Sequence, residues 1–378
     1  MKTVGMRLLA ATLIAVALSA CSLGGGTRSG GLPTAVSQPE SKVSLTPTNE
    51  LPIIATNLAA QQRSDGAILY TSTMISPYFA NTAAIGAVHG GVDLINVQQW
   101  MSWYVAHSTL PNPWSLPGVI TDYNVAANGS ISSTGTADSV DSYAATFISL
   151  AAAAYREGSP ELRTYIEGLQ TSLDLIASTI DAVTDTDGLT WATPTYKEKY
   201  VMDNSEVYHG LVDLAFLRSQ VYGDVAGAAK AAAHAAQIQA AIGTKLWSAS
   251  RSQYAVALDD SGNLTWPQRG NWEDATTQLF PVLHGVIAAT SSPAQIAYNK
   301  LSTEFPNWPS LKKPDEYPWV SIAFVALQMN DLTRASTYAS AIQKKYSPGF
   351  AYPWYCAESG WYIRFLMGLT APSTVADL

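Results

Sequence analysis

The chain has 378 residues and a formal net charge of −8, and charged residues make up 13% of it, against about 25% in an ordinary domain. Acidic net charge without a cluster of Lys and Arg in the mature part excludes nucleic acids and polyanions as partners. The 11 Trp and 19 Tyr residues, with many Ser, Thr, Asn and Gln, favour neutral ligands instead.

The N-terminus has the order of parts of a secretory signal. Lys2 and Arg7 precede an apolar run over residues 8–18, and small residues then lead to Cys21. This end resembles a lipobox, which implies cleavage after residue 20 and diacylation of Cys21. The apolar run is shorter than the roughly 20 residues that a membrane-spanning helix needs. We therefore expect a lipoprotein of the cell envelope, anchored on the outer membrane or on the extracytoplasmic face of the cytoplasmic membrane.

Composition divides the rest of the chain into a linker and one domain. Residues 21–50 are rich in Gly, Ser, Thr and Pro, cannot bury a core, and are predicted to be a flexible tether. Residues 51–378 show no second linker and are predicted to form a single domain. With Cys21 lipidated, Cys356 has no disulfide partner in the chain. We expect a monomer without a metal or cofactor.

Buried and amphipathic helices alternate along this domain. Residues 143–155 are apolar or small all round, whereas residues 161–183 carry apolar side chains on one face only. The buried segments of this kind are 78–88, 143–155, 207–217, 275–287, 319–329 and 361–369. The amphipathic ones are 93–107, 161–183, 225–247, 293–303 and 331–346, with 53–62 as a twelfth helix. The pattern predicts an all-α fold, a closed (α/α)6 toroid of helical hairpins.

Strand signals are few and local. Residues 253–266 alternate around the turn residues 260–263, which predicts a β-hairpin in a loop. The helical pairs have no fixed sequence period, which favours a closed toroid over an open solenoid.

Over roughly residues 65–370 this architecture resembles the six-hairpin glycosidase superfamily. The stretch TADSVDSYAA at 136–145 is similar to the acidic start of an inner helix in the family 8 endoglucanases. In that family a glutamate opens the first inner helix as general acid, whereas here the corresponding stretch, 76–81, reads SPYFAN. The resemblance implies hydrolysis of glycosidic bonds by carboxyl groups and leaves the general acid unassigned.

Acidic residues stand where each buried helix is expected to begin: Asp65, Asp138, Asp141, Asp203, Glu206, Glu273, Asp274, Asp315, Glu316 and Glu358. Parallel inner helices would bring these carboxyls to one end of the toroid. Glycoside hydrolysis needs one protonated and one ionised carboxyl. The predicted catalytic residues are Asp138, Asp141, Glu206 and Glu273, with Asp315, Glu316 and Glu358 in reserve. The alternative is capping, since acids in a first turn stabilise a helix by about 0.3–1 kcal/mol and residues 203–206 have capping-box spacing.

Aromatic residues occupy the same loops, among them Tyr70, Trp266, Trp354 and Tyr355. Their flat apolar faces suit sugar rings, although such rings can also fill gaps between helices. The predicted substrate-binding residues are Asp65, Tyr78, Trp191, Tyr200, Asp203, Tyr208, Trp272, Tyr317, Trp319, Glu358 and Trp361.

The sequence thus favours a glycoside hydrolase acting on a neutral or weakly charged polysaccharide or oligosaccharide. One alternative is a non-catalytic carbohydrate-binding lipoprotein on the same scaffold. Another is a sugar isomerase resembling N-acylglucosamine 2-epimerase, with His209 and His284 as acid and base. Two carboxyls about 5–9.5 Å apart would favour catalysis.

Overall fold

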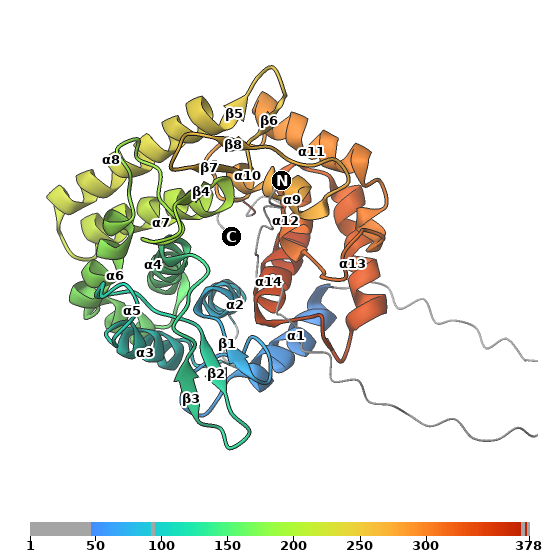
Figure 1. Ribbon diagram of the computed structural model, residues 1–378. Helices are drawn as coiled ribbons and strands as arrows, with labels where there is room; N and C mark the ends of the chain where they lie inside the picture. Colours follow the sequence, from blue (N-terminus) through green and yellow to red (C-terminus); the bar gives the residue numbers. More distant parts are fainter. Residues whose placement is uncertain (1–46, 92–94, 372–374, 376–378) are drawn as a thin grey trace, which may run out of the picture. The chain divides into compact units, whose positions relative to one another are not determined.

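The computed structural model describes residues 47–91, 95–371 and 375, so the predicted signal peptide and Cys21 lie outside the described residues. The described part is a two-layered ring of helices (Figure 1). The inner layer consists of α2 (Pro77–His89), α4 (Val140–Glu157), α7 (Val201–Gln220), α9 (Trp272–Thr277) with α10 (Phe280–Leu283), α12 (Val320–Gln328) and α14 (Cys356–Thr370). The outer layer consists of α1 (Pro47–Gln61), α3 (Val97–Ser108), α5 (Pro160–Glu167) with α6 (Gln170–Ala182), α8 (Val225–Ala241), α11 (Ser292–Glu304) and α13 (Leu332–Tyr346). The predicted toroid is confirmed.

The inner helices close on themselves. Each packs on the next, from α2 through α4, α7, α10 and α12 to α14, and α14 packs on α2. A Cβ added at Gly86 of α2 would overlap the carbonyl oxygen of Gly360 in α14, so the missing side chains let these two helices touch through their backbones. The outer helix α1 also packs on α14, as expected for the twelfth helix, and it begins at Pro47, inside the range predicted as linker.

One predicted inner helix is wrong in its length. Residues 275–287 form no continuous helix, because the chain breaks between α9 and α10. Pro281, in the first turn of α10, has no N–H to donate to the carbonyl of Thr277, and Gly285 leaves the helical conformation with a φ of +72°. The outer segment 161–183 is likewise divided, at Gly168, into α5 and α6. A π-helical turn, Ile242–Leu246, extends α8, and a 3₁₀ turn lies at Trp308–Ser310.

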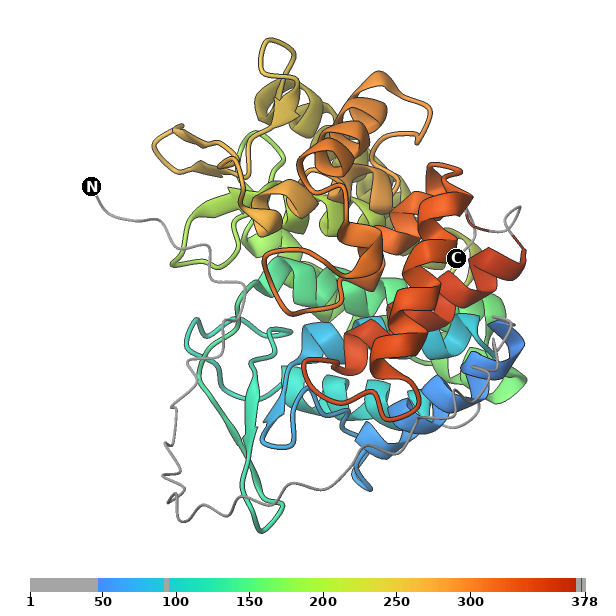
Figure 2. The ribbon, with the colours of Figure 1, turned by 90° about the vertical axis from the view of Figure 1, so that its right-hand side faces the viewer.

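The strands are short and lie in loops, as predicted. One antiparallel sheet has the order β1 (Met74–Ile75), β2 (Tyr123–Val125), β3 (Ile131–Ser133), and another has the order β4 (Glu198–Tyr200), β7 (Ala257–Asp259), β8 (Leu264–Thr265). The pair β7 and β8 is the predicted hairpin, while β6 (Gln253–Tyr254) pairs with β5 (Trp247–Ser248) instead. The β2–β3 and β7–β8 hairpins project from the same side of the ring (Figure 2).

Apolar and small side chains fill the space between the two layers. The inner helix α4 is buried along most of its length, and Phe147, Ile148 and Leu150 are fully enclosed. Within the described ranges, no helix combines the length and the apolar character needed to cross a membrane.

Candidate active site

Four carboxyls gather where α4 and α7 begin. Asp138 lies in the loop before α4, Asp141 in its first turn, and Asp203 and Glu206 in the first two turns of α7. Ser139 fixes the start of α4 by accepting a hydrogen bond from the Ser142 N–H, 3.4 Å. Because α4 and α7 are parallel neighbours in the inner layer, their N-terminal turns lie side by side.

Asp141 is completely buried and its oxygens are occupied. They accept hydrogen bonds from the Ser142 N–H at 2.9 Å, the Thr190 hydroxyl at 2.5 Å and the Ser139 hydroxyl. Burial raises the pKa of Asp141 to about 6, although these donors act in the opposite direction. The predicted catalytic residue Asp141 therefore joins the start of α4 to the segment before β4, and its carboxyl is enclosed by protein.

Asp203 is half-buried, and its Oδ2 accepts a hydrogen bond from Ser139 Oγ at 3.1 Å. Burial, and then the charges of Asp141, Glu206 and Asp138, hold the pKa of Asp203 well above its usual range. The capping-box alternative is wrong here, because α7 already begins at Val201 and both acids lie inside the helix. Asp203 is thus an acid whose pKa is shifted toward the protonated form and whose side chain is partly open.

Glu206 lies deeper, with 4% of its surface exposed. The Tyr78 hydroxyl donates to its Oε1, and His284 Nε2 lies 3.9 Å from the same oxygen. Burial raises the pKa of Glu206 to about 8, so this carboxyl is mostly neutral at pH 7.

Asp138 is the most exposed of these four carboxyls, and Glu273 is a fifth acid that its charge affects. The side chain of Asp138 is exposed to solvent. Partial burial by the surrounding protein, and then the charge of Asp141, raise the pKa of Asp138 to about 6. Glu273, in the first turn of α9, is half-buried, and burial, followed by the charges of Asp274, Asp315 and Asp138, raises its pKa to about 7. The charge of Asp138 also acts on Asp203 and Glu206, so Asp138 is the electrostatic centre of the group.

Sequence reasoning missed Asp122. It precedes β2, is buried, and accepts a 2.9 Å hydrogen bond from the Tyr143 hydroxyl. Burial raises the pKa of Asp122 to about 7, and the charge of Asp138 contributes in the same direction. Its segment has neither helical periodicity nor a strand long enough to show alternation, so no sequence signal marked it.

Other predicted acids have structural partners. Both oxygens of the buried Glu358 accept backbone N–H groups, from Trp319 at 3.0 Å and Val320 at 2.9 Å, and so cap α12. We therefore correct its assignment as a substrate-binding residue. Asp315 accepts from the Trp319 indole at 2.6 Å and pairs with Lys313. Glu316 is exposed.

A row of aromatic rings leads away from the carboxyls. Tyr78 contacts Phe79 with ring centroids 5.2 Å apart, Phe79 contacts Tyr355 at 4.9 Å, and Tyr355 contacts Tyr317 at 6.1 Å. The hydroxyls of Tyr317 and Tyr352 are 3.1 Å apart. The predicted residues Tyr78 and Tyr317 thus belong to one series of contacting rings that joins α2 to the segment before α14.

The remaining predicted aromatics are dispersed. Trp272 is 3% exposed and packs on Phe305, so it fills a gap between helices and offers no face to a sugar, which corrects its assignment. The Trp191 ring lies 4.2 Å from Lys199 Nζ, and the hydroxyls of Tyr200 and Tyr196 are 2.7 Å apart. Tyr208 is half-buried on α7, and Trp319 directly precedes α12. The Trp361 ring contacts His284 and Phe324.

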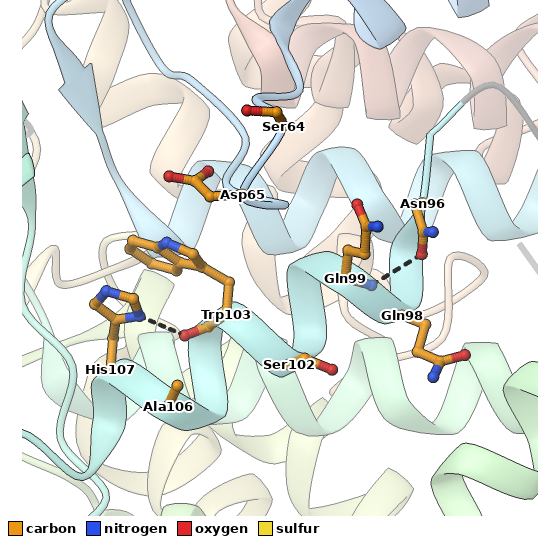
Figure 3. A pocket seen from close by; sticks show the side chains of 9 residues that line it. All are labelled: Ser64, Asp65, Asn96, Gln98, Gln99, Ser102, Trp103, Ala106 and His107. Atoms are coloured by element: carbon orange, nitrogen blue, oxygen red, sulfur yellow. Dashed lines mark hydrogen bonds between the residues drawn. The ribbon is translucent and has the colours of Figure 1, made fainter. Parts of the chain in front are cut away.

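Asp65 lies apart from the carboxyl group. It forms an ion pair with Arg63 at 2.9 Å and lines a separate pocket along the outer helix α3 (Figure 3). The prediction that Asp65 lies in the same site as the other acids is therefore wrong.

The two histidines are neighbours, with ring centroids 6.0 Å apart. His209 Nε2 lies 3.4 Å from Asp213, and burial lowers the pKa of His284 well below its usual range. The Nε2 atom of His284 is enclosed by protein and closed to solvent.

Comparison with solved structures finds the same fold in proteins of known structure. No family model and no curated protein matches the chain. Among solved structures, a wild-type glycosidase is 12% identical with a TM-score of 0.61, and the match covers 86% of this chain and 97% of that one. The GH63 mannosylglycerate hydrolase of Thermus thermophilus, in complex with glucose, is 12% identical with a TM-score of 0.56, covering 85% and 99%. A GH78 rhamnosidase of a Bacillus species is 14% identical with a TM-score of 0.56, covering 86% of this chain and 35% of its own. At these identities the likeness shows the fold.

Proposed function

We propose that the chain is a glycoside hydrolase that acts on a neutral or weakly charged polysaccharide or oligosaccharide. The observation that carries the proposal is the group of carboxyls with raised pKa at the start of α4, α7 and α9, beside the aromatic row. Glycoside hydrolysis uses this combination, an acid kept protonated next to a carboxyl that ionises.

Asp203 is the proposed general acid, because its pKa is held well above its usual range and its side chain is partly open. Asp138 is the proposed base or nucleophile. Its pKa of about 6 leaves it mostly ionised at pH 7, and no hydrogen bond from another described residue occupies its carboxyl. An ionised Asp138 also keeps its neighbours protonated, since like charges close together oppose a second ionisation. Glu206 and Asp141 then maintain the electrostatic environment of the pair.

The aromatic row supports a sugar as the substrate. Tyr78 touches both the row and Glu206, so a sugar ring stacked on the row would lie next to the carboxyls. The isomerase alternative has less support, because an acid or base must reach the substrate and His284 Nε2 is enclosed.

The test is turnover on a panel of neutral polysaccharides by wild type, Asp203→Asn and Asp138→Asn. Each substitution should lower turnover by about 10²-fold or more without unfolding the protein, because it removes proton transfer and little packing. Asp181→Asn, on the exposed face of α6, is the matched control and should retain activity. Full activity in both site variants would refute the assignment. Sugar binding without turnover by wild type would favour the non-catalytic lipoprotein.

The site of action proposed for this enzyme is the cell envelope, with the lipid on Cys21 as its attachment to the membrane. Support comes from the order of Lys2, Arg7, the apolar run and Cys21 in the sequence.

A further inference from the structure

A groove runs along the outer helix α3, beneath the loop that follows α1 (Figure 3). It has a volume of about 570 Å³ and is lined by Ser64, Asp65, Asn96, Gln98, Gln99, Ser102, Trp103, Ala106 and His107. We call the space that these residues line the α3 groove. None of them belongs to an inner helix or to the carboxyl group described above.

The walls of the α3 groove are fixed by specific contacts. The Gln62 amide donates to the carbonyls of Gly66 at 3.1 Å and Asn96 at 2.9 Å, and it accepts from the Asn96 N–H at 2.6 Å. Gly66 has a φ of +94°, and an added Cβ would lie 2.7 Å from the Gln99 carbonyl oxygen. Asn96 caps α3 through the Gln99 N–H at 2.9 Å. The loop and the helix are therefore held together as one preformed surface.

The lining is polar but carries no net positive charge. Hydrogen bonds from Arg63 and from the Ala67 N–H at 3.1 Å offset the effect of partial burial and lower the pKa of Asp65, which keeps it ionised and paired with Arg63. His107 Nδ1 lies 2.7 Å from the Trp103 carbonyl, which can only accept, so Nδ1 carries a proton and donates to it. Among the described residues, the side-chain amides of Gln98 and Gln99 have no hydrogen-bond partner.

Trp103 forms the floor. It is 5% exposed, and its ring stacks on those of His107 and Trp100, with ring centroids 3.7 Å and 5.3 Å apart. Its indole Nε1 is buried without a hydrogen-bond partner in the described part of the chain. A buried N–H left unpaired costs free energy, so this indole is an unsatisfied donor within the floor of the groove.

We propose that the α3 groove is a second carbohydrate-binding site, outside the ring, for a neutral oligosaccharide segment. Free amides, a fixed carboxylate and hydroxyl groups are the donors and acceptors that sugar hydroxyls need, and Gln99 to His107 span about 12 Å along the helix. An anion would meet the carboxylate of Asp65. A peptide would find little apolar surface for an anchor, because Ala106 is the only aliphatic residue among the described residues of the lining.

This inference rests on the proposed function in one respect, the choice of neutral polysaccharides as probes. Full-length protein in detergent is run in native gels that contain soluble starch, hydroxyethyl cellulose, arabinoxylan or glucomannan, and retardation gives the dissociation constant. The groove variants are Gln98→Ala/Gln99→Ala and Asp65→Asn. Gln237→Ala, an exposed glutamine on the outer helix α8, is the matched control, and Asp203→Asn tests the central site.

At least one polysaccharide should retard the wild type, and each groove variant should weaken that binding about tenfold or more, since several hydrogen bonds are lost. Gln237→Ala and Asp203→Asn should still be retarded. Circular dichroism should show all variants folded. Retardation that survives both groove variants would overturn the proposal, and so would the absence of retardation by all four polysaccharides. Loss of turnover in Asp203→Asn with retained retardation would separate the two sites. Because retardation measures binding alone, the α3 groove can be tested even if the hydrolase assignment fails.

Discussion

Glu206→Gln tests the electrostatics of the carboxyl group without needing a substrate. Glu206 has a pKa of about 8 in the folded chain against 4.5 as the ordinary value, mainly because it is buried. A folded-state pKa above the unfolded one contributes stability that is fully present below about pH 4.5 and is lost as pH rises through about 8. Ionising this carboxyl inside the ring is therefore unfavourable.

The magnitude follows from the shift. A difference of about 3.5 pKa units, at 1.36 kcal/mol each, is about 5 kcal/mol of unfolding free energy lost between pH 4 and 9. The glutamine cannot ionise, and its oxygen can still accept the Tyr78 hydroxyl. Wild type should thus lose stability relative to the variant as pH rises.

Urea unfolding of wild type and Glu206→Gln at intervals between pH 5 and 9 measures this difference directly. Other titrating groups are common to both proteins and largely cancel in the comparison. Glu167→Gln, at the exposed end of α5, is the control and should follow the wild type at every pH. Parallel curves for Glu206→Gln and wild type would show that Glu206 is not held neutral by burial, and the reasoning would fail.

Two further predictions concern the ring and the anchor. Gly86→Ala should lower the unfolding free energy by about 1–3 kcal/mol or more, because its methyl group would overlap the Gly360 backbone. A methyl group at Gly243 meets nothing within 4 Å, so Gly243→Ala should be nearly neutral. Equal stability of the two variants in urea would contradict the close approach of α2 and α14. Cys21→Ser should leave an unlipidated, unprocessed precursor, and mass spectrometry that finds no lipid on wild-type Cys21 would refute the lipoprotein prediction.

Helical periodicity predicted most of the fold because each inner helix is buried on both sides and each outer helix on one. It failed where a local backbone rule overrode the apolar pattern. Pro281 stood inside the predicted helix 275–287, and its missing N–H was visible in the sequence as a reason for the break between α9 and α10. Apolar composition alone could not show it.

The candidate site was predictable in outline only. Parallel inner helices made it foreseeable that Asp138, Asp203 and Glu206 would converge. Which acids are structural depends on partners distant in sequence, such as Thr190 for Asp141 and the start of α12 for Glu358. A pattern of residue types contains no information on side-chain direction, so these roles required the structure.

The meeting of α1 with α14 has a consequence for how the chain is made. Gln343 and Ser347 bond Glu50 across almost the whole sequence, at 3.0 and 3.3 Å, next to the seam where the first and last helices join. Contacts between residues so far apart are slow to form, and they form only after the C-terminal residues are present. During synthesis α1 would therefore stay without its partner helix until α14 has been made, and only then could the ring close. Loss of α14 would leave an open ring with exposed apolar surface that is prone to aggregate, which is more severe than a small loss of stability.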